Sequence, residues 1–187
     1  MKKAILIIDC GSEKVKALEE TLTQLNFDFE TLPFTLLNDI EIEEYPGVII
    51  SGSPILIADN NPFLAYFTFL KTYQNPVLGI CFGHQIIGKM FGVEVFKTKE
   101  DRASTEIEIL NSSILFNAIP TPMVMKEDHT EAIDLPEGFI LLAKSKNCSN
   151  EAMQHQMLPI FGVQFHPEVS GIQGIQLINN FCKRTIN

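Results

Sequence analysis

The sequence has no tryptophan, no long apolar segment and few basic residues, with 14 Lys and Arg against 23 Asp and Glu. Its apolar runs are short, as in Ala4–Ile8, which Asp9 ends, so we expect neither a signal peptide nor a membrane span. A formal net charge of -9 without a basic run argues against a nucleic-acid-binding surface. These absences predict a cytoplasmic protein that binds neither membranes nor nucleic acid.

Common cofactor motifs are also absent. The four cysteines include no CxxC pair and no zinc-like spacing, and Cys10, Cys148 and Cys182 are expected to be reduced thiols. Neither a GxxxxGKS/T loop nor a GxGxxG run occurs in the sequence. We therefore expect no metal, no cofactor and no nucleotide site of the chain's own.

The first half of the chain alternates short apolar strands with amphipathic helices. The expected strands cover residues 4–8, 27–34, 47–51 and 77–81, and the expected helices cover residues 15–25, 62–73 and 83–91. Such alternation predicts an α/β fold with an open, mostly parallel sheet that helices cover on both faces. At 187 residues, we expect one domain over residues 1–187.

The second half has shorter strands with turn-rich connections. Strands are expected at residues 93–96, 105–110, 123–126 and 139–143, followed by a buried strand at 158–165 and a helix at 172–184. This pattern predicts an antiparallel edge or a small second sheet rather than a separate domain.

The stretch Gly79–Gln85 joins a strand to a helix and carries Cys81 at the turn. A glycine lies two residues away on either side of the cysteine, as a nucleophile elbow requires, because larger side chains would clash with the adjacent strand and helix. Gly11 and Gly52 also follow predicted strands, and sites in parallel sheets form at such strand ends. The alternative is a buried structural cysteine.

A catalytic cysteine needs a base, because little of a free thiol is ionised at neutral pH. His166 follows a buried strand, and Pro167 biases it towards an extended backbone, so Glu168 can face the same side and orient the imidazole. A metal pair and a simple salt bridge are the alternatives. Of the other histidines, His84 could line the site, whereas His129 and His155 are interpreted as surface residues.

Acyl chemistry also needs donors for an oxyanion. The N–H of Phe82 at the start of the helix is one candidate, and the turn around Gly52 and Ser53 is the other. A plain strand-to-helix loop is the alternative for that turn.

The segments Pro76–Gln85 and Gly162–Glu168 together resemble the class I, triad-type glutamine amidotransferases, and the resemblance covers nearly the whole chain. Within that family the chain is most similar to the glutaminase subunits of two-subunit GMP synthases, which Thr105–Ile109 and Cys148–Met153 also support. The resemblance implies a flavodoxin-like fold and a thioester mechanism with glutamine as the substrate. The implied catalytic residues are Cys81, His166 and Glu168, the implied oxyanion donors are Phe82, Gly52 and Ser53, and the implied substrate-binding residues are Gln85, Ala103, Ser104 and Thr105.

The resemblance also implies a partner, a separate ATP-dependent synthetase subunit that receives the ammonia and converts XMP to GMP. The chain departs from the family pattern at Glu13 and at Ser53. It also departs at Met125–Glu131, where the subgroup has Trp-x-Ser-His-x-Asp, a segment implied to lie near the synthetase. Hydrolysis of another γ-glutamyl compound, a different acceptor for the ammonia, and a regulatory binding module remain alternatives.

Overall fold

The chain folds as a layered α/β structure, and the computed structural model describes residues 4–59 and 62–185. The strands are β1 (Ile5–Asp9), β2 (Phe29–Pro33), β3 (Val48–Ile50), β4 (Val77–Ile80), β5 (Val95–Asp101), β6 (Ser104–Ile109), β7 (Met123–Lys126), β8 (His129–Ile133), β9 (Phe139–Lys144), β10 (Ala152–His155) and β11 (Ile160–Val163). The α-helices are α1 (Val15–Gln24), α2 (Phe82–Met90) and α3 (Gly171–Thr185), and the 3-10 segments are η1 (Phe34–Asp39), η2 (Ile42–Glu44), η3 (Pro62–Lys71), η4 (Ile114–Phe116) and η5 (Pro167–Val169).

Over the described residues the strands form a nine-stranded sheet in the order β2-β1-β3-β4-β11-β10-β9-β6-β7 and a two-stranded sheet of β5 and β8. Strands β2, β1, β3, β4 and β11 pair in parallel, whereas β10, β9, β6 and β7 continue the sheet with antiparallel pairs. The prediction of a mostly parallel sheet with an antiparallel edge and a small second sheet is therefore confirmed.

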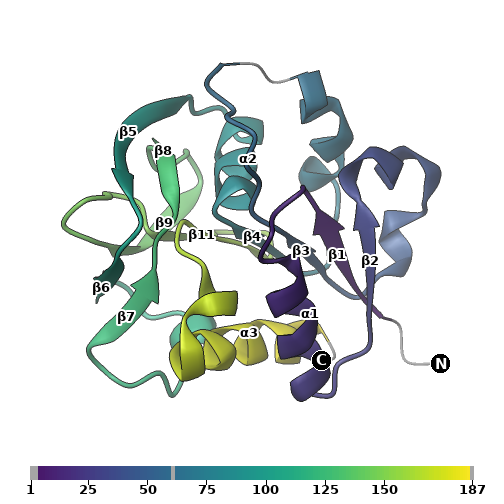
Figure 1. The fold of residues 1–187 in the computed structure, drawn as a ribbon. Coiled ribbons are helices and arrows are strands. Elements are labelled where there is room, and N and C mark those ends of the chain that lie inside the picture. Colours follow the sequence, from purple (N-terminus) through teal and green to yellow (C-terminus); the bar gives the residue numbers. More distant parts are fainter. Residues whose placement is uncertain (1–3, 60–61, 186–187) are drawn as a thin grey trace.

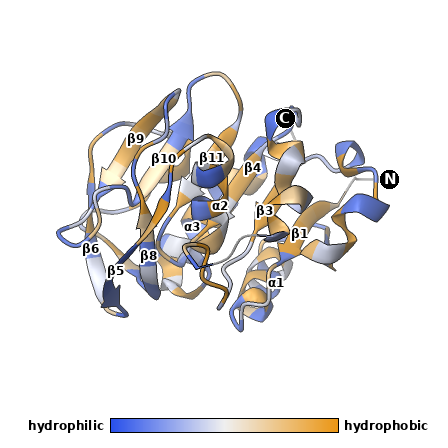
Figure 2. Cartoon of the chain, turned by 90° about the horizontal axis from the view of Figure 1, so that it is seen from above, coloured by the Kyte–Doolittle hydropathy of each residue, from blue (hydrophilic) through white to orange (hydrophobic). Residues whose placement is uncertain are grey.

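The large sheet has an apolar layer on each face, with α1 and α3 on one side of the sheet and α2 on the other (Figure 1). On β1, Ile5 and Ile7 pack with α1 and α3, while Leu6 and Ile8 pack with η3 and α2 on the other face. This alternation explains why the strand is a continuous apolar run, since both faces are buried. Figure 2 shows the result, with hydrophobic colour over β1, β3 and β4 at the centre of the molecule.

Three local expectations were wrong. The segment after Asn61, expected to be an α-helix, is the 3-10 segment η3, in which aromatic and Thr residues of modest helix propensity predominate. Strands β8 and β10 were missed, because β8 begins within a polar run and β10 is only four residues long. Strand β8 carries the buried residues His129 and Glu131, which lie at the site described below.

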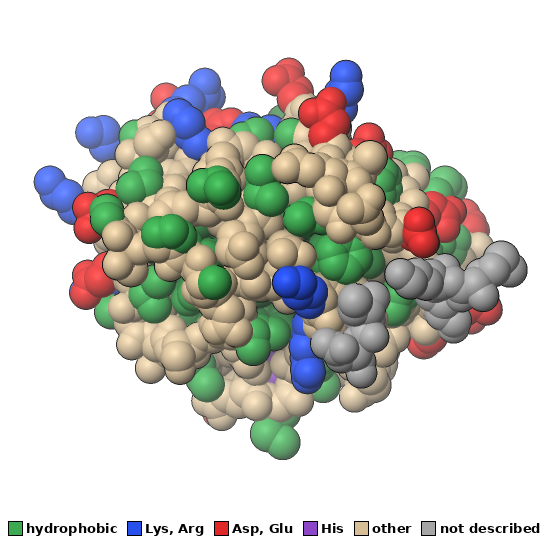
Figure 3. All heavy atoms as spheres, turned by 90° about the horizontal axis from the view of Figure 1, so that it is seen from below, with side chains coloured by type: hydrophobic (Ala, Val, Ile, Leu, Met, Phe, Trp, Pro, Cys, Tyr) green, Lys and Arg blue, Asp and Glu red, His purple; other side chains and the backbone are tan. Residues whose placement is uncertain are grey.

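Two further findings concern the described part of the chain. None of its helices is long and apolar enough to cross a bilayer. All four cysteines are free thiols, and all are buried. On the face shown in Figure 3, apolar side chains are scattered among polar ones and do not form one continuous patch.

Candidate active site

Cys81 lies on a sharp turn between β4 and α2, with a positive φ of 50°. A side chain at Gly79 would come within 2.5 Å of the backbone of Gly83, and one at Gly83 would come within 2.5 Å of the carbonyl oxygen of Ile50. Only glycine fits at these two positions, because the helix begins directly against the strands. The backbone N–H of Cys81 donates to Val163 on β11, which anchors the turn. The predicted nucleophile elbow therefore has the expected geometry.

Polar groups surround the thiol on two sides. The side-chain amide of Gln164 donates to Cys81 Sγ at 3.6 Å, and Sγ in turn lies 3.7 Å from the backbone oxygen of Asp128. The Gln164 amide oxygen accepts from Gln85 Nε2 at 3.2 Å. The same Gln85 nitrogen donates to the backbone oxygen of Glu131 at 2.9 Å. Gln85 is thus held behind the thiol by a network rather than pointing freely into solvent.

His166 and Glu168 form a buried pair beside the thiol. His166 Nδ1 lies 2.7 Å from Glu168 Oε1, and the two side chains are 3% and 4% exposed. The backbone of His166 is fixed on both sides, because its N–H donates to the oxygen of Lys126 and its carbonyl accepts from the hydroxyl of Ser170. The thiol of Cys81 lies close enough to the imidazole to affect its pKa.

The pKa of His166 responds to these neighbours. Burial lowers the pKa, but the interactions of the ring with Cys81 and Glu168 outweigh it and raise the pKa to about 10. An imidazole that holds its proton this firmly carries a positive charge at neutral pH. A positive charge beside a cysteine is the environment that a cysteine nucleophile needs.

Gly52 lies directly behind the imidazole. A Cβ at this position would be 2.9 Å from His166 Cε1 and 3.8 Å from Cys81 Cβ. The hydroxyl of Ser51 donates to the carbonyl oxygen of Gly52 at 2.9 Å. Because C=O and N–H point in opposite directions across a trans peptide, the N–H of Ser53 points away from Ser51. The turn therefore holds a peptide of fixed orientation beside the imidazole, and its role as an oxyanion donor stays a prediction.

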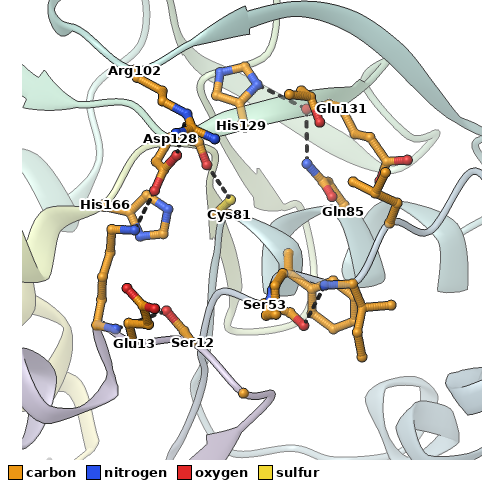
Figure 4. A pocket seen from close by; sticks show the side chains of 17 residues that line it. Ser12, Glu13, Ser53, Cys81, Gln85, Arg102, Asp128, His129, Glu131 and His166 are labelled. Carbon is orange, nitrogen blue, oxygen red and sulfur yellow. Dashed lines mark hydrogen bonds and ion pairs between the residues drawn. The ribbon is translucent and has the colours of Figure 1, made fainter.

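A cavity of about 510 Å³ opens in front of Cys81 (Figure 4). Its walls come from the loops after β1 and β3, the elbow, the β5–β6 turn, the start of β8 and the end of β11. The predicted site residues Ser53, Cys81, Phe82, Gln85 and His166 all line it. Glu13, one of the departures from the family pattern, lines it as well.

Three charged side chains meet at this cavity from different loops. Lys14 Nζ lies 2.5 Å from Asp128 Oδ2, and Arg102 Nε lies 3.4 Å from Asp128 Oδ1. Burial raises the pKa of Asp128, but the charges of Lys14, His166 and Arg102 outweigh this effect, so the pKa lies below its ordinary value. Asp128 is therefore a carboxylate between two cations. Figure 4 shows Arg102, Asp128 and His166 on one side of the cavity and Gln85 with Glu131 on the other.

The remaining predicted substrate-binding residues lie elsewhere. Ala103, Ser104 and Thr105 are not among the residues that line the cavity, and Ser104 and Thr105 pair with Lys126 and Met125 in the β6–β7 ladder. The carbonyl oxygen of Ala103 accepts from the N–H of Glu127. Their predicted role in binding the substrate stays a prediction, and the neighbouring residue that does reach the cavity is Arg102.

Of the other three histidines, His84 and His129 differ from expectation. His84 does not line the cavity; it is completely buried against Gly162, and burial lowers its pKa to about 3. His129, interpreted as a surface residue, is 7% exposed and lies at the start of β8, so that interpretation was wrong. His155 is half-buried and packs its ring against Phe91 and Phe139.

Behind the cavity wall lies a cluster of buried carboxylates. His129 Nε2 is 3.4 Å from Glu127 Oε2, and the side chains of Glu127 and Glu151 are both buried. Burial and the charge of Glu127 raise the pKa of Glu151 to about 8. Burial lowers the pKa of His129, whereas the charges of Glu127 and Glu151 raise it by more. Even so, across residues 4–59 and 62–185 no three His, Cys, Asp or Glu side chains are placed to hold a metal ion.

Gln164, Asp128, Lys14 and Arg102 are site residues that sequence reasoning did not identify. For Gln164 a signal existed, because i and i+2 residues of an extended segment share a side, and Gln164 is two residues before His166. Lys14, Arg102 and Asp128 had no such signal, since they lie on three separate loops. Only the tertiary structure brings them together.

Comparison with known proteins agrees with this geometry. The family model of class-I glutamine amidotransferases matches residues 6–185. The glutamine-hydrolyzing GMP synthase subunit of Thermococcus kodakarensis is 38% identical over 183 residues, covering 96% of this chain and 97% of that protein. The protein of the same name from Methanocaldococcus jannaschii is 35% identical over 184 residues, covering 96% of each chain.

Solved structures show the same fold. A Thermoplasma acidophilum protein described as a subunit of GMP synthase superimposes with a TM-score of 0.89 at 27% identity, covering 98% of this chain and 94% of that one. A glutamine amidotransferase from Thermotoga maritima has a TM-score of 0.76 at 24% identity, covering 98% of this chain and 84% of that one. The second likeness concerns the fold alone.

Proposed function

Because the chain belongs to the class I glutamine amidotransferase family, we propose that it hydrolyses the side-chain amide of glutamine to glutamate and ammonia. The ammonia passes to a separate synthetase subunit. The observation that carries this proposal is a cysteine on a strained elbow, beside a buried histidine–glutamate pair and open to a cavity. In this proposal residues 1–187 form a single amidotransferase domain.

In the first half of the reaction Cys81 attacks the amide carbon of glutamine. His166 takes the thiol proton, so that a thiolate and an imidazolium face each other, and then gives a proton to the nitrogen as the C–N bond breaks. Ammonia leaves, and the glutamyl group stays on Sγ as a thioester. The raised pKa of His166 supports this assignment because the imidazole then holds the proton that the leaving nitrogen needs.

In the second half, water attacks the thioester. His166, now neutral, removes a proton from the water and returns one to the departing thiolate, which releases glutamate. Glu168 holds Nδ1 of the imidazole at 2.7 Å and stabilises the imidazolium each time it forms. Glu168 is a positioning residue in this scheme, since it acts through His166.

The negative oxygen of the tetrahedral intermediates needs N–H donors. We assign this role to the N–H of Phe82 and the peptide of Gly52 and Ser53. The first N–H groups of a helix have no partner within the helix, and α2 begins at Phe82. The bond from Ser51 to the carbonyl of Gly52 supports the second assignment, because it fixes the orientation of that peptide.

The relatives named as glutamine-hydrolyzing GMP synthase subunits support a finer proposal for the partner. Identity of 38% to such proteins over nearly the full length suggests that this chain also works with a second, ATP-dependent subunit. In this proposal the acceptor of the ammonia is XMP, bound by that second subunit. The glutaminase chemistry does not depend on this choice of acceptor.

The test measures glutamate release from glutamine by the purified chain, alone and mixed with an ATP-dependent synthetase subunit that aminates XMP. Cys81→Ala should abolish glutamate release in both conditions while the thermal unfolding temperature stays near that of the wild type. Glutamate release that survives this substitution, or its absence from the wild-type chain in both conditions, contradicts the proposal.

Cys10→Ala is the matched control. Cys10 is also a buried cysteine just after a parallel strand, but burial raises its pKa far above the ordinary value, which keeps it a neutral thiol. The control should retain glutaminase activity. GMP formation in the mixture, from XMP, ATP and glutamine, identifies the acceptor separately from the hydrolysis itself.

A further inference from the structure

Gln164 touches the nucleophile, yet it belongs to neither the triad nor the oxyanion donors. Its side chain is completely buried, and its amide nitrogen lies 3.6 Å from Cys81 Sγ. We propose that Gln164 is a further catalytic residue, whose side-chain N–H group stabilises the thiolate form of Cys81. This inference rests on the proposed role of Cys81 as the nucleophile and adds to it a residue that prepares the sulfur for attack.

The first argument is the position of Gln164 beside the elbow. Strands β4 and β11 pair in parallel, and their ladder ends at the pair of Ile80 and Val163. Cys81 and Gln164 are the next residues on these two neighbouring strands. The N–H of Cys81 donates to the oxygen of Val163 at 2.8 Å, and the N–H of Gln164 is bonded at 2.8 Å on the opposite side, to β10. The backbone of the sheet therefore fixes both residues at their contact.

The second argument is the direction of the hydrogen bonds that reach Gln164. The backbone oxygen of Glu131 can only accept, so the Gln85 atom that lies 2.9 Å from it is the amide nitrogen. That nitrogen donates its second hydrogen to Gln164 at 3.2 Å, where the acceptor is the amide oxygen. The nitrogen of Gln164 is consequently the atom that faces sulfur. A reversed amide would place two donors together and an oxygen lone pair against Sγ.

The third argument is the charge of the sulfur. In the thiol form, Sγ donates to the backbone oxygen of Asp128 at 3.7 Å. When the sulfur has lost its proton, that oxygen faces a negative charge, whereas the N–H of Gln164 becomes a donor to a charged acceptor. Hydrogen bonds to charged groups are stronger than hydrogen bonds between neutral groups. Gln164 therefore favours the thiolate over the thiol.

The alternative is a purely structural role, in which Gln164 only accepts from Gln85 and fills the space behind Cys81. The two roles use opposite ends of the amide. A structural role needs the oxygen that accepts from Gln85, and a catalytic role needs the nitrogen that donates to Sγ. A substitution that keeps one end and removes the other separates them.

Gln164→Glu is that substitution, because it keeps the side-chain length and the acceptor for Gln85 but presents an oxygen to Sγ. Gln164→Met removes both ends of the amide. The test measures iodoacetamide labelling of Cys81 as a function of pH, kcat/KM for glutamine, and the thermal unfolding temperature in each protein.

Both variants should label Cys81 only at higher pH than the wild type. One hydrogen bond to a charged group corresponds to about one pH unit in Gln164→Met and to about a 10-fold fall in kcat/KM at pH 7. Gln164→Glu should show the larger shift, because its oxygen repels the thiolate. The limiting labelling rate at high pH, where every protein has a thiolate, should stay close to that of the wild type.

Gln154→Met is the matched control. Gln154 lies on β10, beside β11, where its side chain accepts from the hydroxyl of Ser113, and it does not line the cavity. This substitution should leave the labelling profile and kcat/KM unchanged.

Other groups near the thiol also titrate and must not differ between the proteins that are compared. Burial and the charge of Glu127 raise the pKa of Glu151 to about 8, and the backbone oxygen of Glu151 accepts from the N–H of Gln164. All of these groups are the same in the wild type and the variants, so a difference between the profiles reports Gln164. Besides His166, the charged or titratable side chains that line the cavity with Cys81 are those of Glu13, Lys14, Arg102, Asp128, His129 and Glu131.

Two results would overturn the inference. A Gln164→Glu protein with the labelling profile and kcat/KM of the wild type would show that only the oxygen end matters. A lower limiting labelling rate with no shift in pH would show that the substitutions displace the thiol and leave its charge unaffected. If Gln164→Met does not fold, Gln164→Glu still decides, because it keeps the bond to Gln85. A wild type inactive on glutamine fails the proposed function, whereas the labelling profiles still test Gln164, so the two failures are distinguishable.

Discussion

A single methyl group added at Gly52 should lower the catalytic rate while leaving the stability of the fold almost unchanged. In Gly52→Ala the new Cβ would stand 2.9 Å from His166 Cε1. Carbon atoms in contact are normally about 3.5–4.0 Å apart, so the imidazole must move by at least about 0.6 Å. The ring cannot simply turn aside, because Glu168 holds Nδ1 and the backbone of His166 is bonded at both its N–H and its carbonyl.

The size of the effect follows from that displacement. A misplacement of about 1 Å in an active site can cost about 100-fold in rate, so a shift of about 0.6 Å should cost about 10- to 100-fold in kcat. Each factor of ten corresponds to about 1.4 kcal/mol of activation free energy. The thermal unfolding temperature should change little, since the other neighbours of the new Cβ, Ser12 Oγ and Cys81 Cβ, lie at 3.5 and 3.8 Å.

The assay combines kcat for glutamine hydrolysis, the unfolding temperature, and the pH dependence of Cys81 alkylation by iodoacetamide. Gly79→Ala is the contrasting variant, because its Cβ would meet backbone at 2.5 Å and should lower the unfolding temperature strongly. A Gly52→Ala protein with wild-type kcat would refute the reasoning. So would a variant whose loss of activity is matched by an equal loss of folded protein.

Two further predictions concern buried carboxylates. Glu168→Gln should lower kcat by about 10²- to 10⁴-fold. It should also shift Cys81 alkylation to higher pH, because loss of the carboxylate lowers the pKa of His166. An alkylation profile identical to that of Glu137→Gln, a substitution at an exposed position, would contradict this prediction. Glu151, whose pKa is raised to about 8, binds its proton more tightly in the folded chain than in the unfolded one, so stability should fall as pH rises from about 4.5 to about 8. Glu151→Gln should remove most of that decline, on the order of a few kcal/mol in urea unfolding at pH 8.5, and equal slopes of stability against pH in both proteins would argue against the assignment.

The parts of the fold and site that could be predicted from the sequence are those that depend on local periodicity. Continuous apolar runs identified the parallel strands β1, β3, β4 and β11, because burial on both faces leaves no polar alternation. The i, i+2 rule for extended backbone predicted that His166 and Glu168 face each other, and their side chains do lie 2.7 Å apart. The backbone that brings them together was not predicted, because Pro167–Val169 form the 3-10 segment η5 instead of an extended segment. Glycine spacing around Cys81 predicted the elbow, since Gly79 and Gly83 are required by close contacts with the backbone around the turn.

Buried polar residues escaped prediction for a physical reason. His129 and Glu127 belong to a polar run that is typical of a surface turn, yet both are buried with Glu151, which is more than twenty residues further along the chain. Such groups can be buried only where other polar or charged groups pair with them, and the tertiary structure brings these partners together. The antiparallel pairing of β8 with β5 brings β8 into the fold and could not be predicted from either strand alone.

The segment from Lys126 to Glu131 shows how closely this chain's departures from the family pattern lie to its chemistry. The resemblance implied that this segment lies near the synthetase. In the structure it also contacts the proposed nucleophile, base and substrate-binding residue. The oxygen of Lys126 accepts the N–H of His166, the oxygen of Asp128 lies at Cys81 Sγ, and the oxygen of Glu131 accepts the amide of Gln85.

All three contacts are made by backbone oxygens, which every residue type supplies. The segment can therefore change its side chains, as it has at the positions where the subgroup has Trp and Ser, and still hold the elbow, the imidazole and Gln85 in place. What changes is the set of side chains that the same backbone presents to the cavity, and Asp128 is one of them. The departures should consequently alter recognition of the substrate or of the partner more than the rate of the thioester chemistry.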